Sequence, residues 1–164
     1  MANKLSHYID TFNKKQGDYT SLVIIPLLAI VLYEVMMRYV FNAPTIWGFE
    51  ATTFAYGLHY MFGLSYTDVY DGHVKVDIFT NLLPKKLQAV MGIITLLILF
   101  FPVITCLTIW SFKFALTSLS NMEVNSTSWA PPIYPFKIIM AFTLFFLWLQ
   151  GVSNLFKQFD ALKN

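Results

Sequence analysis

Long apolar runs are the feature that most constrains this chain. They lie at about residues 20–41, 47–69, 85–117 and 135–156, and short polar stretches separate them. Each run is long enough for an α-helix that crosses about 30 Å of hydrocarbon. Hydrophobic residues make up 57% of the 164 residues and charged residues only 12%, which leaves too little polar surface for an ordinary soluble domain. We therefore expect one all-α membrane domain with four transmembrane helices, surrounded by lipid.

The basic residues predict how these helices are oriented. If both termini are cytoplasmic, eight lysines lie on the cytoplasmic side and only Arg38, Lys113 and Lys137 lie toward the other side. Basic residues concentrate on the cytoplasmic side of membrane proteins, so the N-in, C-in arrangement is favoured. The net charge is only +2 and the lysines are scattered, a pattern that does not indicate nucleic-acid binding.

Two stretches outside the spans are expected to lie along the membrane surface. Residues 4–15 carry apolar residues on one helical face between lysines, at Leu5, Ile9 and Phe12. This spacing predicts a short amphipathic interfacial helix, and a frayed polar terminus is the alternative. Residues 70–84 form a predicted cytoplasmic interfacial loop, in which Asp77 is placed to cap a short helix.

Charge gathers where the first span ends and the second begins. Glu34 and Arg38 lie four residues apart with the acid first, the better orientation for an ion pair on a helix. Ionised side chains within lipid normally face protein. Pro44 disfavours helix at the residue before it, so a hairpin tip with a polar face is expected. The candidate subunit-interface or structural residues are Glu34, Arg38, Asn42, Trp47, Glu50 and Asp77.

The sequence does not indicate an enzyme or a metal site. Cys106 is the single cysteine and lies in an apolar run, and the serines lack the glycine-flanked elbow of hydrolases. Acids and a histidine gather near residues 68–77, but a surface loop that also holds Lys75 favours capping and solvation over metal binding.

Three functional classes remain open from the residues alone. The first is an accessory membrane subunit, because the two halves of the chain do not resemble each other as those of a secondary transporter usually do. The second is a haem- or quinone-associated anchor of a respiratory oxidoreductase, although only His59 lies within a span and a two-histidine haem needs two. The third is a structural protein that associates only with itself.

Several short motifs resemble the small membrane subunit (DctQ-type) of tripartite ATP-independent periplasmic, or TRAP, transporters. The resemblance spans residues 38–151, and it rests on order and spacing, since each motif alone is loose. One departure is Phe49, which stands where the family often has the first of two adjacent acids, so that a role for an acidic pair is in doubt. The matching residues are Arg38 to Asn42 (RYVFN), Pro44, Trp47, Glu50, Gly72 to Asp77 (GHVKVD), Pro84, Trp129 to Pro132 (WAPP), Tyr134, Pro135, Lys137 and Leu149 to Gly151 (LQG).

The resemblance implies a three-part uptake system in the bacterial inner membrane. A periplasmic binding protein would capture an organic acid, and a large membrane subunit would carry the substrate with sodium. The small subunit would pack against that large subunit and anchor it in lipid, with no pathway and no cofactor of its own. The outward loops are then expected to help form the docking surface for the binding protein, at Ala43, Thr45, Ile46, Asn125, Trp129 and Pro131.

Overall fold

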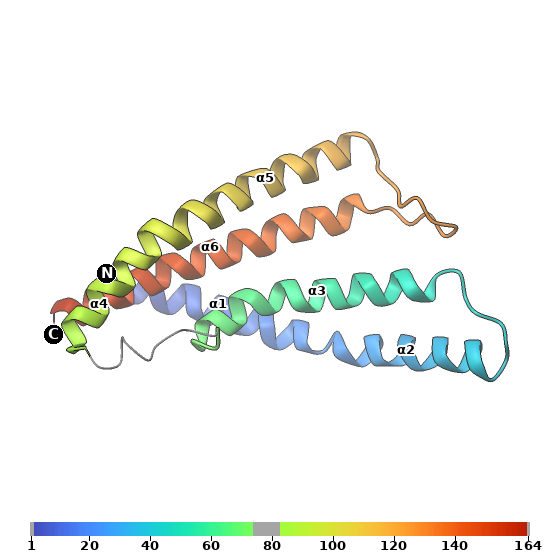
Figure 1. Cartoon of the computed structure of the whole chain (residues 1–164), viewed down its shortest axis with the longest axis horizontal. Helices are drawn as coiled ribbons and strands as arrows, with labels where there is room; N and C mark the ends of the chain where they lie inside the picture. Colours follow the sequence, from blue (N-terminus) through green and yellow to red (C-terminus); the bar gives the residue numbers. More distant parts are fainter. Residues whose placement is uncertain (1, 74–82, 164) are drawn as a thin grey trace.

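The computed structural model describes residues 2–73 and 83–163, which form helices joined by turns and loops (Figure 1). The all-helical class expected from the sequence is confirmed for these residues. The loop position Asp77 lies outside them. The helices are α1 (Ala2–Ser21), α2 (Ile24–Tyr39), α3 (Gly48–Val69), α4 (Lys85–Thr95), a π-helical turn η2 (Leu96–Phe100), α5 (Phe101–Ser120) and α6 (Tyr134–Lys163).

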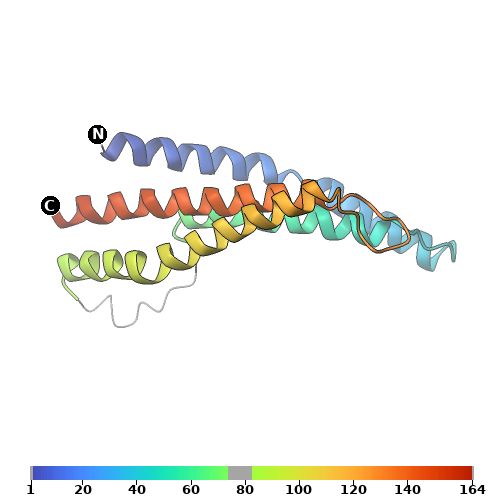
Figure 2. The ribbon, with the colours of Figure 1, turned by 90° about the horizontal axis from the view of Figure 1, so that it is seen from above.

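The molecule is elongated, and its two ends differ (Figure 1). Both termini and the start of α4 lie at one end, which we call the terminal end. The α2–α3 loop and the α5–α6 loop lie at the other, which we call the loop end. The α2–α3 pair and the α5–α6 pair separate toward the loop end, whereas α1 packs against α3 and α6 at the terminal end (Figure 2).

The break between α1 and α2 follows from Pro26. A proline inside a helix has no N–H, and its ring clashes with the carbonyl four residues earlier, here that of Leu22. The Leu22 carbonyl instead accepts a bond from the Ile25 N–H at 3.1 Å, and a two-residue turn interrupts the helix. Residues Lys4–Tyr39 still form one helical segment of 36 residues that is long and apolar enough to cross a membrane. The helical segment is therefore longer than either the 4–15 or the 20–41 range expected from the sequence.

Helix α1 turns uncharged polar side chains toward the protein, while large apolar side chains face outward beside charged ones such as Lys15 and Asp18. Ser6 and Asn13 are buried, whereas Leu5, Tyr8 and Phe12 are exposed. This is the reverse of a helix in a water-soluble protein. Lipid tails accept apolar side chains as readily as a core does, so polar side chains gain most by bonding to neighbouring helices. The interfacial position of residues 4–15 stays a prediction.

The third apolar run is one continuous helix with a π-helical turn. It extends over 36 residues, Lys85–Ser120, slightly beyond the expected 85–117. Pro102 follows the π turn, in which the Phe101 N–H bonds to the Leu96 carbonyl five residues back. The wider π turn accommodates Pro102, which has no N–H to donate to the preceding turn. It also places Phe100 against Gly151 of α6, where an added Cβ would lie 2.1 Å from the Phe100 ring.

A buried hydrogen-bond network joins α1 to α6 at the terminal end. Asn13 donates to the Gln150 side-chain oxygen at 2.8 Å, and Gln150 donates to Asp10 at 2.9 Å. Ser153 donates to the same Asp10 oxygen at 2.7 Å. Lys157 pairs with the other Asp10 oxygen at 2.8 Å. Asn13, Gln150 and Ser153 are fully buried, so this network fixes how α1 lies on α6.

Three helical segments are long and apolar enough to cross a membrane among the described residues: Lys4–Tyr39, Lys85–Ser120 and Tyr134–Leu162. The last is longer than the expected 135–156. Helix α3, Gly48–Val69, nearly coincides with the expected 47–69 and has 22 residues, but it is more polar than the other three. Three membrane-length apolar helices are thus shown, rather than four.

The network predicts a coupling between Asn13 and Gln150. Replacing either by Leu leaves a buried amide without its partner, and each single change should lower the free energy of unfolding by roughly 1–2 kcal/mol. The double variant should lose less than the sum, with a coupling of about 0.6–1.7 kcal/mol. The measurement is SDS-induced unfolding in mixed micelles, followed by circular dichroism. Thr117→Val is the control, because this exposed hydroxyl bonds only to its own helix at Lys113. Strictly additive losses would contradict the coupling.

Candidate functional site

A chain of hydrogen bonds links the end of α2 to the start of α3. Arg38 pairs with one carboxylate oxygen of Glu34 at 2.9 Å, as their spacing predicts. The Thr45 hydroxyl donates to the other Glu34 oxygen, and the Gly48 N–H donates to the Thr45 oxygen at 3.0 Å. Glu34 is thus held from both sides. The α2–α3 tip is a defined structure that presents the Arg38 guanidinium, 51% exposed.

Asn42 and Trp47 shape this tip. Asn42 lies three residues after the end of α2 and has φ 50°, in the left-handed region that asparagine tolerates better than most residues. The next N–H, of Ala43, then donates to the Met37 carbonyl at 2.9 Å. Trp47 stacks on Tyr33 of α2, with ring centroids 5.8 Å apart and 19° between the planes. Both residues therefore hold the hairpin in shape.

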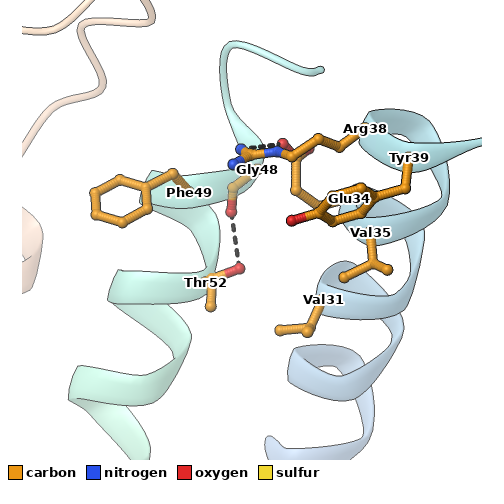
Figure 3. A pocket seen from close by; sticks show the side chains of 8 residues that line it. All are labelled: Val31, Glu34, Val35, Arg38, Tyr39, Gly48, Phe49 and Thr52. Carbon is orange, nitrogen blue, oxygen red and sulfur yellow. Dashed lines mark hydrogen bonds and ion pairs between the residues drawn. The ribbon is translucent and has the colours of Figure 1, made fainter. Parts of the chain in front are cut away.

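A groove of about 250 Å³ lies between the two helices below the ion pair (Figure 3). Arg38 and Glu34 stand at its upper edge, and apolar side chains line most of the rest. The groove thus combines a cation with an apolar wall at the loop end of the chain. Its lining residues are Val31, Glu34, Val35, Arg38, Tyr39, Gly48, Phe49 and Thr52.

The structure does not bring Glu50 to Arg38. Glu50 is only 5% exposed, and its Oε2 atom has no hydrogen-bond partner among the described residues. The ion pair of Arg38 is made with Glu34 on its own helix. Arg38 and Glu50, which stand at the two ends of the hairpin, therefore do not pair with each other across the tip. A role for Glu50 at a subunit interface stays a prediction.

The residues expected to form the docking surface for the binding protein differ in their exposure. Ala43, Ile46 and Trp129 are exposed, Thr45 and Asn125 are half-buried, and Pro131 is buried. Pro131 is buried where the α5–α6 loop pairs with itself: its carbonyl accepts the Asn125 N–H at 2.8 Å. Both loops lie at the loop end (Figure 1). The exposed positions share one end of the molecule, and Pro131 supports the loop rather than offering a free surface.

An ion pair fastens the α5–α6 loop to α6. Lys137 lies 2.5 Å from Glu123, and its ammonium group also stands 3.9 Å from the centre of the Phe114 ring. The hydrogen bond from Lys137 holds the pKa of the Glu123 carboxyl below its ordinary value of 4.5. A lowered pKa means that the pair stabilises the folded loop at neutral pH. The contribution is lost only as the pH falls through that lowered pKa.

Comparison with known proteins identifies the family. Residues 27–161 match the family described as tripartite ATP-independent periplasmic transporters, DctQ component. The chain belongs to this family. A segment of 76 residues, 46% of the chain, is 29% identical to the sialic acid TRAP transporter permease protein SiaT of Haemophilus influenzae (strain 86-028NP). The match covers 12% of that permease, so the chain corresponds to a small part of its length.

The DctQ family is a component of a transport system and not an enzyme family. Its description places it in a tripartite system, which has three components. The alternative of a respiratory anchor rested on His59, and this residue faces its own chain, with Nδ1 3.3 Å from the Thr20 carbonyl. In residues 2–73 and 83–163, no group of three or more His, Cys, Asp or Glu side chains is placed to hold a metal ion.

Sequence reasoning missed the buried network of this DctQ component. Its signal was present, because Gln150 and Ser153 are polar residues three apart within an apolar run, and Asn13 and Gln16 have the same spacing. Such spacing puts both side chains on one helix face, and polar side chains within membrane helices commonly bond to another helix. The search for charged residues passed over these neutral amides and hydroxyls.

Substituting two glycines of α3 by alanine should have opposite effects on the stability of the subunit. A Cβ on Gly48 would lie 2.4 Å from a Glu34 oxygen and 2.7 Å from the Thr45 hydroxyl, whereas Gly63 has nothing within 4 Å. Gly48→Ala should displace the Glu34 carboxylate and lower the free energy of unfolding by about 1–2 kcal/mol. Gly63→Ala should be neutral or stabilise by up to about 1 kcal/mol. Unfolding of the purified DctQ component measures both, and equal effects would contradict the assignment.

Proposed function

We propose that this chain is the small permease subunit of a sodium-coupled TRAP transporter for an organic acid. It packs against the large transport subunit, widens and anchors it in the bilayer, and has no pathway of its own. The proposal rests on the exposure of α2. This helix has no buried residue in the chain itself, and it ends in a tip that presents an exposed Arg38. A helix so placed gains from a protein neighbour.

The SiaT match supports both the partner and the substrate class. A segment similar to this chain forms 12% of that permease, so a much longer part of the same polypeptide lies beyond the match. A covalent link of this kind supports a large permease subunit as the partner of a separate small chain. The substrate in the relative's name is sialic acid, an organic acid, which supports the same class of substrate here.

The positions of the charges support the N-in, C-in topology in a bacterial inner membrane. Both termini lie at the terminal end, together with the start of α4 at Lys85 (Figure 1), and Lys4 and Lys163 are close to the two termini in the sequence. Basic residues favour the cytoplasmic side, so the loop end is periplasmic. In this arrangement α3 is the fourth span, because it runs from the α2–α3 loop at the loop end back toward the terminal end. Its greater polarity is compatible with a helix that contacts protein on several sides.

The two periplasmic loops supply part of the docking surface for the substrate-binding protein. Ala43, Ile46 and Trp129 are exposed there, and the loops that hold them are anchored by Glu34 and Lys137. A loop fixed in advance binds with less loss of conformational entropy than a mobile one.

Native mass spectrometry of the tagged subunit, extracted gently from its own host membrane, tests the proposal. We expect a one-to-one complex with a much larger membrane protein. Arg38→Ala should weaken this complex roughly tenfold, about 1.4 kcal/mol, because it removes the exposed cation and half of the Glu34 ion pair. Arg38→Lys should retain part of the affinity. The control is Lys113→Ala, which removes an exposed cation from α5. Recovery of the subunit alone, or with redox subunits and a bound haem, would overturn the proposal.

The docking surface has a separate test. Replacing residues 43–46 and 124–132 by neutral linkers should lower the affinity of the binding protein for the reconstituted complex about tenfold or more, since both exposed loop surfaces are lost. Binding to proteoliposomes measures the affinity, and native mass spectrometry confirms that the membrane subunits remain together. Unchanged affinity and unchanged uptake would contradict this part of the proposal.

A further inference from the structure

Helix α3 carries a stripe of exposed aromatic residues that the chain itself leaves uncovered. Phe49, Tyr56 and Tyr60 are 75%, 58% and 61% exposed. Positions 49, 53, 56, 60 and 63 follow one another at alternating steps of four and three. This is the spacing by which one helix packs its side chains into a neighbouring helix. We call Phe49, Tyr56, Tyr60 and Gly63 the α3 stripe.

The tyrosines of the α3 stripe stand at an unfavourable depth for contact with lipid. They lie near the middle of a 22-residue helix, whereas tyrosine in membrane proteins concentrates at the two interfaces. Their rings stack with centroids 6.2 Å apart, and neither hydroxyl has a hydrogen-bond partner within the described part of the chain. A hydroxyl without a partner is unfavourable in hydrocarbon. A neighbour that accepts a hydrogen bond removes this penalty.

The exposed face of α5 provides the contrast. Its outward side chains are mostly aliphatic, at Val103, Leu107, Ile109 and Leu116, and they are joined in the half of α5 toward the loop end by Trp110 and Phe114. Exposure alone therefore does not distinguish the two helices, but chemistry does. The α3 stripe combines two phenolic hydroxyls with an open glycine, whereas the exposed side chains of α5 around Leu107 and Leu116 carry no hydroxyl.

Gly63 provides that gap. Other helix glycines are filled from inside the chain: Gly57 by the Phe136 ring at 2.7 Å and Gly151 by the Phe100 ring at 2.1 Å, measured from an added Cβ. Nothing lies within 4 Å of the same point at Gly63. Small residues in membrane helices allow a neighbouring helix to approach closely. The notch beside Tyr60 is thus open to a side chain from outside this chain.

The α3 stripe continues the groove at the α2–α3 tip. Phe49 is the first residue of the stripe and also lines the groove that holds Arg38 (Figure 3). One continuous surface therefore runs from an exposed cation at the loop end to the notch at Gly63. Its occupant needs an acceptor near the periplasmic side, acceptors at mid-depth and an apolar side chain farther in.

We propose that one transmembrane helix of the large permease subunit packs along the α3 stripe, placing an apolar side chain in the Gly63 notch and accepting hydrogen bonds from Tyr56 and Tyr60. The inference rests on the proposed function. The choice of occupant follows from the SiaT relative, in which the segment similar to this chain belongs to a much longer permease polypeptide. The α5 face remains in contact with lipid.

Site-specific photocrosslinking in the intact complex tests this placement. p-Benzoylphenylalanine replaces Tyr56 or Tyr60 in the α3 stripe, and Leu107 or Leu116 on α5 as matched controls. We expect crosslinks to the large subunit from the two α3 positions only. Crosslinks to it from α5 but not from α3 would overturn the inference while leaving the proposed function intact. Crosslinks from α3 to a second copy of this chain would overturn the inference. Absence of a large-subunit crosslink from any of the four positions, together with recovery of the subunit alone, would overturn both.

Substitutions provide an independent measurement. Gly63→Leu fills the notch and should weaken binding of the large subunit at least tenfold, and the Tyr56→Phe, Tyr60→Phe pair should weaken it several-fold. None of these changes should lower the free energy of unfolding of the isolated subunit, because nothing lies within 4 Å of a Cβ added at Gly63 and the two tyrosine rings stack on each other. Leu107→Phe on α5 is the control and should leave the complex intact. Wild-type affinity for the Gly63→Leu complex would contradict the placement.

Discussion

Hydrogen bonding between polar side chains buried at the contact of α1 and α6 is the interaction on which this fold depends. Apolar residues gain little by leaving lipid for a helix interface, so close packing and polar bonds must position the helices. Gln150 and Gly151 provide both at adjacent positions of α6. Gln150 bonds to Asn13 and Asp10 of α1, and Gly151 admits Phe100 from the π-helical turn. Because α6 contacts α1, α3, α4 and α5, one short segment sets the arrangement of the terminal end.

The loop end is held by fewer and more local contacts. Helix α2 packs against α3 through the Glu34–Thr45–Gly48 chain and the Tyr33–Trp47 stack, and none of its residues is buried. Helices α5 and α6 are joined there by Lys137, which pairs with Glu123 and covers Phe114. Between the two helix pairs, the Phe136 ring of α6 packs against Phe54 and Gly57 of α3. The part of the chain proposed to meet other subunits is the part with the least internal packing, where a partner supplies the missing contacts.

The sequence predicts local features well and lateral packing poorly. Apolar length places α3 almost to the residue and the Glu34–Arg38 spacing gives the ion pair, whereas the break between α1 and α2 at Pro26 was not among the expectations. The buried side of α1 could not be read from Leu5, Ile9 and Phe12, because an apolar face fits lipid and protein equally well. Local sequence rules also could not predict that Glu50 is buried away from Arg38, since the direction of its side chain depends on how α3 rotates against its neighbours.

The same physics determines what recognition between membrane subunits requires. If contact between apolar helices is hardly better than contact with lipid, a partner must offer what lipid tails lack, namely hydrogen-bond acceptors, countercharge and side chains that fill notches. This chain uses its amides, Asn13 and Gln150, to bond its own helices, and it leaves phenolic hydroxyls, a guanidinium and an open glycine on its surface. Internal folding and external assembly therefore draw on different polar groups, so a partner can bind without competing for the bonds that hold the subunit together.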